Sequence, residues 1–258
     1  MVLEMYDGAS LLVDYKGPGD PVTAADRRSN HLLVQRLNQA FPGIPVVAEE
    51  SEPASFEGFR EAERVFFVDP LDGTREFIQR NGEFAVMIGL VEGFRAVAGA
   101  VCAPAIGVTW VGAVGLGAWK IGSQASRSAV RVSVTDALAQ ARIVASRSHR
   151  SARLERVLAA LDAREVRPMG SAGIKGAHVA EGLADAYVDT SGSTKRWDAC
   201  AVDALVTVAG GCVSDVTGAP IDYRGPSLAN ERGLVVSNGL MHEAILTRIA
   251  SQETGNSG

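Results

Sequence analysis

The chain has 258 residues, of which 47% are hydrophobic and 21% charged, so it can build a sizeable core without disulfides or a structural metal. Its formal net charge of −5 argues against a nucleic-acid polymer as partner, because proteins that bind such polymers usually carry a basic face. A small phosphorylated substrate is compatible with this charge, since a few local cations can dominate the field at a site.

The sequence also argues against a membrane location. Residues 1–10 have no basic segment before an apolar run, so we expect no signal peptide. The most apolar stretch, residues 85–101, is interrupted by Glu92 and Arg95 and is too short to span a bilayer. The three cysteines lie far apart and indicate reduced thiols in a core. We therefore expect a cytoplasmic protein.

The first half of the chain combines one long helix with short strands. A helical period of apolar residues predicts a helix over 26–41, and Thr23 with Asp26 resembles a capping box at its start. An antiparallel sheet is expected next, with a short helix at 74–80 and a connection at 122–132. Its strands are predicted at 46–48, 65–68, 85–90, 96–101, 108–114 and 117–121.

In the second half, strands and helices alternate, which favours an α/β arrangement with some parallel pairing. Strands are predicted at 142–145 and 186–188, and helices at 151–161, 175–181 and 198–209. The last helix is apolar except for Asp203, so it should be buried. We expect a layered α/β fold, an αβαβα sandwich with a smaller mixed sheet in this half. The expected domains are 1–130, an α+β part with most metal ligands, and 131–258, an α/β part.

Acidic residues stand at the ends of several of these elements. Asp69 and Asp72 lie in the segment Asp-Pro-Leu-Asp-Gly-Thr, which we expect to form a tight turn after a strand. Glu49 follows another short strand, and Asp198 opens the buried helix. Carboxylate oxygens are the ligands that Mg²⁺ prefers. A pair of cations activates water and neutralises phosphoryl oxygens, so converging carboxylates favour hydrolysis of phosphate esters.

Two neighbours add to this set. Gly73 and Thr74 begin a helix, whose free N–H groups favour a bound phosphate, and the Thr74 hydroxyl could orient the attacking water. Taken alone, each acidic residue also has a structural explanation: Asp26 as part of a capping box, Asp198 as a helix cap, and Glu49 in a solvated loop. Their occurrence together and in this order favours the functional reading.

Three segments resemble the signatures of the inositol monophosphatase superfamily. They are Asp-Pro-Leu-Asp-Gly-Thr at 69–74, Glu-Glu at 49–50, and Trp-Asp at 197–198 followed by Ala-Gly-Gly at 209–211. Further segments resemble its 3'(2'),5'-bisphosphate nucleotidase branch, namely 75–78, 81–84, 146–149, 170–175 and 195–201. The resemblance runs in order over residues 20–240, and several independent motifs are more specific than one. Residues 2–6 are interpreted as the remnant of the family's longer first helix.

The resemblance implies a role for each matching residue. The magnesium ligands would be Glu49, Asp69, Leu71 through its carbonyl, Asp72 and Asp198. The catalytic residues would be Asp26, Glu49 and Thr74. The substrate contacts would be Gly73, Ser146, His149, Ser171, Lys175 and Asp198. Two or three Mg²⁺ ions per site, sensitivity to lithium and a role in sulfur assimilation are also implied.

The implied reaction is removal of the 3'-phosphate of 3'-phosphoadenosine 5'-phosphate, by metal-activated water, to give AMP and phosphate. An inositol or sugar phosphate phosphatase is the alternative with the same chemistry, and a non-catalytic nucleotide- or metal-binding protein is the third hypothesis. Some bacterial members carry an arginine soon after the strand that precedes the Trp-Asp motif, where this chain has Asp-Thr-Ser-Gly at 189–192. A nucleotide contact is therefore expected to be lost there, and Lys195 or Arg196 could compensate. A homodimer is compatible with the sequence.

Overall fold

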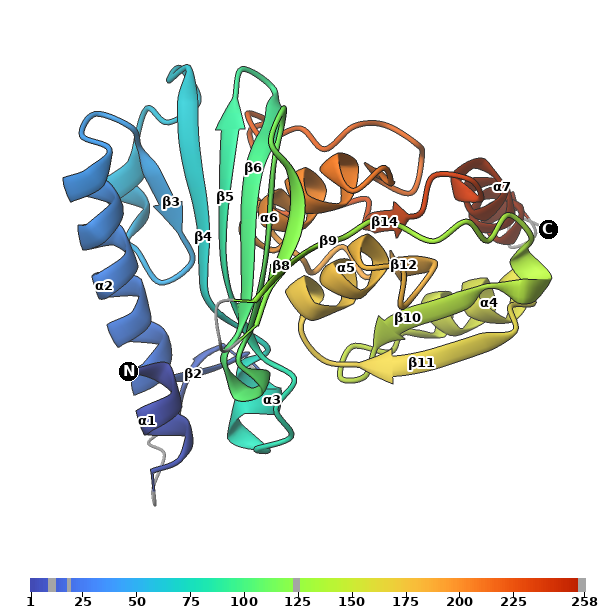
Figure 1. Cartoon of the computed structure of the whole chain (residues 1–258), viewed down its shortest axis with the longest axis horizontal. Coiled ribbons are helices and arrows are strands. Elements are labelled where there is room, and N and C mark those ends of the chain that lie inside the picture. Colours follow the sequence, from blue (N-terminus) through green and yellow to red (C-terminus); the bar gives the residue numbers. More distant parts are fainter. Residues whose placement is uncertain (9–12, 18–19, 123–125, 255–258) are drawn as a thin grey trace.

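The computed structural model describes the chain except for residues 9–12, 18–19, 123–125 and 255–258. Helices and two β-sheets alternate in layers (Figure 1). One helical layer covers the outer side of the large sheet, two helices lie between the sheets, and two more cover the far side of the small sheet. The predicted αβαβα sandwich is confirmed. None of the described helices is both long and apolar enough to cross a membrane.

The large sheet has seven strands in the order β3-β4-β5-β6-β7-β8-β9. These are β3 (Val46–Ala48), β4 (Arg64–Asp72), β5 (Ala85–Glu92), β6 (Arg95–Ala103), β7 (Val108–Ala113), β8 (Gly117–Ile121) and β9 (Arg127–Ala129). All neighbours are antiparallel except β3, which pairs with β4 in parallel. The prediction of a connection at 122–132 missed a strand, because this segment contains β9 at the edge of the sheet.

The segment around Asp69 is not the tight turn that we expected. It is the last part of β4, and it stays paired with β5 through a shift of register between Asp69 and Asp72. Such a bulge lets one strand carry an extra residue, and it tolerates Pro70, which has no N–H to donate. The strand therefore delivers both aspartates at its end without reversing direction.

The small sheet has five strands in the order β11-β10-β12-β14-β13. They are β10 (Arg142–Ser146), β11 (Glu165–Met169), β12 (Ala186–Asp189), β13 (Cys212–Ser214) and β14 (Leu234–Ser237). β10 is parallel to both β11 and β12, whereas β14 is antiparallel to β12 and β13. The sheet is mixed, as predicted. The first sheet ends at Ala129 and the second begins at Arg142, and the two-domain division near residue 130 stays a prediction.

The remaining elements are short except for the helices that build the layers. The helices are α1 (Val2–Tyr6), α2 (Ala24–Ala40), α3 (Thr74–Ile78), α4 (Ala152–Leu161), α5 (Ala172–Ala180), α6 (Arg196–Val208) and α7 (His242–Thr254), with short 3₁₀ turns at Pro53–Phe56, Pro104–Ile106 and Leu138–Gln140. A separate hairpin joins β1 (Val13–Gly17) to β2 (Asp20–Thr23). α5 begins three residues before the predicted start, because Ser171 caps it by accepting a hydrogen bond from the Ile174 N–H (3.0 Å).

α6 is the buried helix of the central layer, as predicted from its apolar sequence. It lies so close to the large sheet that a Cβ on Gly99 of β6 would be 2.2 Å from the Ala201 carbonyl oxygen. Glycine at this position therefore permits the close approach of helix and sheet. The approach places the first turn of α6, with Asp198, opposite the end of β4.

Candidate active site

A cavity of about 550 Å³ lies where the end of β4, the start of α5 and the start of α6 meet. It is lined by all the residues that the sequence assigns to the site except Asp26. The predicted residues, which come from segments far apart along the chain, therefore meet at one cavity. The roles of these residues in binding and catalysis stay predictions.

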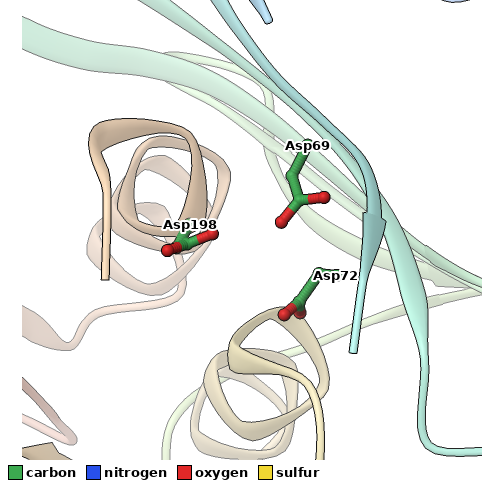
Figure 2. Close-up of side chains that lie close together, drawn as sticks. All are labelled: Asp69, Asp72 and Asp198. Carbon is green, nitrogen blue, oxygen red and sulfur yellow. The ribbon is translucent and has the colours of Figure 1, made fainter. Parts of the chain in front are cut away.

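Three aspartates form a compact group at one end of the cavity. Asp69 and Asp72 come from β4 and Asp198 from α6, and their side chains lie close together, with the Asp72 carboxylate at the start of α5 (Figure 2). One carboxylate oxygen from each residue lies within 4.8 Å of the others. Local bonds orient two of them: Asp69 accepts from the Leu71 N–H (3.0 Å), and Asp198 accepts from the Lys195 N–H (2.6 Å).

Asp72 is held by the opposite half of the molecule. Its carboxylate accepts hydrogen bonds from the first N–H groups of α5, those of Ala172 (3.0 Å) and Gly173 (2.7 Å), and from the Ser171 hydroxyl. These N–H groups have no partner within their helix, and the helix dipole favours a negative charge beside them. The start of α5 therefore fixes Asp72 while the other two aspartates face it.

The electrostatics of the group show an excess of negative charge. Burial, and then the charges of Glu49 and Asp72, raise the pKa of Asp69 well above its usual range. Burial, Asp72 and Glu49 likewise raise the pKa of Asp198 to about 8. The three carboxyl groups, of which Asp69 is buried and Asp72 and Asp198 are partly buried, offer hard oxygen donors that fit a divalent cation such as Mg²⁺. The cation would replace the protons and compensate the charge.

Glu49 lies beside this group but is not part of its compact core among the described residues. Its Oε1 atom is 2.9 Å from the ammonium of Lys16 on β1, and the same ammonium also pairs with Glu50. Burial raises the pKa of Glu49 to about 6, although Lys16 opposes the effect. Lys16 was not predicted, because a single lysine in a short polar strand carries no signal.

Thr74 and Asp26 form the second polar pair of the site. The Thr74 hydroxyl lies 2.9 Å from Asp26 Oδ1 and 3.2 Å from the Leu71 carbonyl oxygen. The other oxygen of Asp26 accepts from the N–H (2.8 Å) and hydroxyl (2.6 Å) of Thr23, which caps α2. Asp26 therefore takes part in the capping box and also pairs with Thr74. It lies behind Thr74 and does not line the cavity.

The rest of the cavity wall carries the expected substrate contacts. Lys175 is buried, with its ammonium 4.9 Å from the centre of the Tyr187 ring, and burial lowers its pKa. Burial, and then the charge of Arg75, lower the pKa of His149. The Ser146 hydroxyl accepts from the His149 N–H (3.0 Å), so it shapes this loop. Gly73 also lines the cavity, in the left-handed conformation (φ 91°) that glycine adopts most easily.

The wall also contains buried residues to which the sequence analysis gave no role. Glu76 accepts a hydrogen bond from the Ser148 hydroxyl (2.6 Å), and Tyr187 lies under Lys175. Glu76 lies within a segment that resembles the nucleotidase branch, so a position-by-position reading of that segment could have marked it. Tyr187 sits on a short apolar strand, where an aromatic residue indicates core.

Comparison with known proteins gives a consistent result. The sequence model of the inositol monophosphatase family matches residues 1–254. The 3'(2'),5'-bisphosphate nucleotidase CysQ of Escherichia coli O157:H7 is 39% identical over 225 residues, which cover 86% of this chain and 87% of that protein.

Solved structures agree on the fold. The extragenic suppressor protein suhB of Bartonella henselae matches with a TM-score of 0.83 and 26% identity, over 96% of this chain and 92% of that one. The Thermotoga maritima IMPase matches with a TM-score of 0.83 and 26% identity, over 98% of this chain and 93% of that one.

Proposed function

The chain belongs to the inositol monophosphatase family, and we propose that it is a phosphoric monoester hydrolase of the 3'(2'),5'-bisphosphate nucleotidase type. Under this proposal it removes the 3'-phosphate of 3'-phosphoadenosine 5'-phosphate to give AMP and phosphate. The 39% identity to a bisphosphate nucleotidase over most of both chains supports the substrate class. Inhibition by lithium and a role in sulfur assimilation belong to the same proposal.

The observation that carries the proposal is the group of three aspartates at the end of the cavity. Their oxygens, within 4.8 Å of one another, would hold Mg²⁺. Glu49 and the Leu71 carbonyl, which also line the cavity, would complete a site for two or three ions. When bound, Mg²⁺ neutralises the phosphoryl oxygens and lowers the pKa of water. A protein that only binds nucleotides would not need a group of converging carboxylates that repel one another.

Thr74 and Asp26 would orient the attacking water. The Thr74 hydroxyl has one proton, and Asp26 Oδ1 at 2.9 Å accepts it. The lone pairs of Thr74 Oγ1 are then left to accept a hydrogen bond from water, so that the water's own lone pair is directed toward phosphorus. Asp26 is itself fixed by two hydrogen bonds from Thr23, so the direction of the Thr74 proton is set before substrate arrives.

The other half of the cavity would hold the nucleotide. The Lys175 ammonium and the His149 ring line it, and they come from the small-sheet side of the molecule. A cation in a partly closed cavity attracts phosphate more strongly than one in bulk water. The phosphate to be cleaved would lie at the aspartates, and the rest of the substrate along this wall.

The test is a panel of phosphate monoesters at equal concentration. Phosphate release from 3'-phosphoadenosine 5'-phosphate and from inositol 1-phosphate is measured with Mg²⁺ and with EDTA. We expect Mg²⁺-dependent release that favours the nucleotide. Preference for inositol 1-phosphate would keep the metal chemistry and replace the substrate, whereas no Mg²⁺-dependent release from any ester would refute the proposal.

A further inference from the structure

One cationic side chain of the cavity wall has no partner in the protein. The lysine and arginine side chains that line the cavity are Lys16, Arg75, Lys175 and Lys195. Within the described part of the chain, the Lys195 ammonium makes no hydrogen bond and no ion pair. A positive charge in a partly closed cavity without a counter-charge attracts an anionic ligand.

The other three cations of the lining are engaged by protein groups. The Lys16 ammonium forms an ion pair with Glu49 (2.9 Å), and the Arg75 guanidinium donates to the Ser148 carbonyl oxygen (3.3 Å). Lys175 is buried, and four carboxylates oppose the effect of its burial. Each of these cations shares its charge with the protein, whereas the charge of the Lys195 ammonium is available to a ligand.

The backbone of Lys195 is fixed although its side chain is free. Its N–H donates to the Asp198 carboxylate (2.6 Å), and its carbonyl oxygen accepts from the Asn230 amide (2.7 Å). The four-carbon stem of the lysine therefore starts from a fixed point that is one hydrogen bond away from a proposed metal ligand. An anion at its ammonium would lie near the aspartate group and yet outside it.

The structure distinguishes Lys195 from Arg196, the other residue that could compensate for the missing arginine. Arg196 does not line the cavity. Its guanidinium donates to the side-chain oxygen of the buried Asn230, the same residue that donates to the Lys195 carbonyl. Arg196 thus supports the loop from behind Asn230, and of the two residues Lys195 is the one that can meet a substrate.

The loop before Lys195 adds neutral donors to this charge. Three of its residues line the same cavity with hydroxyl groups, namely Ser191, Ser193 and Thr194. The Thr194 hydroxyl accepts from Asn230 (3.1 Å), so its own proton is left to donate. Asp189, which precedes the loop, is among the carboxylates around Lys175, so another ammonium balances its charge. Hydroxyl donors beside an ammonium suit a phosphate group.

We propose that Lys195 is a specificity-determining residue, which binds a second phosphate of the substrate, the one that is not cleaved. The inference rests on the proposed function and narrows it to bisphosphates. The scissile phosphate would lie at the aspartates, and the second phosphate of the same molecule would lie at the Lys195 ammonium. A monophosphate of the same nucleoside, or of a polyol, would leave this ammonium without a partner.

The first arm of the test uses the wild-type protein alone. Phosphate release is compared for 3'-phosphoadenosine 5'-phosphate and adenosine 3'-phosphate, which differ by the second phosphate. A charge-assisted hydrogen bond to that group predicts a kcat/KM about tenfold or more higher for the bisphosphate. Equal kcat/KM values for the two nucleotides would overturn the inference without any variant. Absence of release from both, and from inositol 1-phosphate, would instead refute the proposed function.

The second arm uses Lys195→Met, which keeps an unbranched side chain and removes the ammonium. We expect KM for the bisphosphate to rise, kcat to stay within a few fold, and the ratio of kcat/KM between the two nucleotides to fall toward one. Lys195→Arg keeps the positive charge and should retain most of the preference. Arg248→Met removes one positive charge from an exposed position on α7 and should leave the ratio unchanged.

Two results of this arm would contradict the assignment. An unchanged ratio in Lys195→Met would show that another group binds the second phosphate. An equal loss of preference in Lys195→Met and Lys195→Arg would show that the residue acts through the shape of the loop and not through its charge.

Discussion

Asp69, Asp72 and Asp198 repel one another as long as no cation lies among them. The raised pKa values of Asp69 and Asp198 express that repulsion together with burial. These aspartates destabilise the fold when no metal is bound, as residues selected for function rather than stability commonly do. The same charges give the site its affinity for a cation.

Asp69→Asn separates these two effects. We expect turnover of the nucleotide to fall by several powers of ten, because a charge that holds the cation is lost. The metal-free protein should unfold at a higher temperature than wild type, since one of the buried like charges is removed. Phosphate release and thermal unfolding in EDTA measure the two quantities, and Asp136→Asn, at an exposed position away from the cavity, is the control. Near-normal turnover would show that Asp69 is not a metal ligand.

Thr74→Val tests the orientation of water. The valine has the same shape but can neither donate a hydrogen bond to Asp26 nor accept one from water, so kcat should fall by about 10²- to 10⁴-fold with little change in KM. Thr74→Ser retains the hydroxyl and should recover most of the activity. If the valine and serine variants had the same kcat, the hydroxyl would have no part in the reaction.

At the scale of elements, the sequence predicted those parts that short-range patterns determine. Apolar runs located most strands of the large sheet, and the Thr23–Asp26 capping box located the start of α2. β11 was missed because four of its five residues are exposed and carry no apolar run. The end of β4 was predicted as a turn because Pro70 and Gly73 usually break strands, whereas the bulge depends on pairing with β5.

The candidate site shows the same division. The three aspartates were predicted correctly as neighbours, because each stands in a segment that resembles a family signature and these segments occur in the expected order along the chain. The ion pair of Lys16 with Glu49 and the hydrogen bonds from the start of α5 to Asp72 depend on contacts between segments that are distant in the sequence. No local pattern reports such contacts, so they were beyond the sequence analysis.

The close packing of α6 on β6 gives a prediction for these elements. Gly99→Ala would place its Cβ 2.2 Å from the Ala201 carbonyl oxygen, so helix and sheet must move apart. We expect a loss of about 1–3 kcal/mol in the free energy of unfolding and weaker Mg²⁺ binding, since α6 carries Asp198. Denaturant unfolding and calorimetry check the two effects.

The matched control for this change is Ala100→Ser on the same strand. It also adds one heavy atom, but the neighbouring side chain points to the opposite face of the sheet. The control should remain near wild type in both measurements. Equal stability of the Gly99 and Ala100 variants would show that α6 is not held as tightly as this packing requires.

At the scale of the whole molecule, the site joins the two sheets. Two aspartates come from the large sheet, the third from the central helix layer, and the start of α5 binds Asp72 across the gap. Asp185, in the loop between α5 and β12, forms an ion pair with Arg142 at the start of β10 (2.8 Å). This ion pair connects the loop after α5 to the small sheet. A cation among the aspartates would therefore stabilise the assembly of both halves.

This arrangement predicts how stability depends on pH. The pKa values of Asp198, about 8, and Glu49, about 6, lie above those of unfolded chains, near 4. The folded protein then binds more protons than the unfolded one, so the stability of the metal-free protein should fall as pH rises from about 5 to 8. Saturating Mg²⁺, which takes the place of these protons, should remove the trend.

Thermal unfolding across this pH range, with EDTA and with Mg²⁺, gives the measurement. A second change is expected in acid: although burial opposes it, hydrogen bonds from Arg142 and Ser133 lower the pKa of Asp185 to about 2. The stability that Asp185 contributes is present above about pH 4 and is lost as pH falls toward 2. A metal-free protein that became more stable between pH 5 and 8 would contradict the assigned charges.

The most direct test asks whether a cation lies among the three aspartates. Crystals grown with Mn²⁺, which has the same oxygen ligands as Mg²⁺ and scatters anomalously, would show its position. We predict an anomalous peak at bonding distance, about 2.0–2.3 Å, from oxygens of Asp69, Asp72 and Asp198 together. No peak at this group in crystals with saturating Mn²⁺, or a peak held by other residues alone, would contradict the metal site on which the proposed hydrolysis depends.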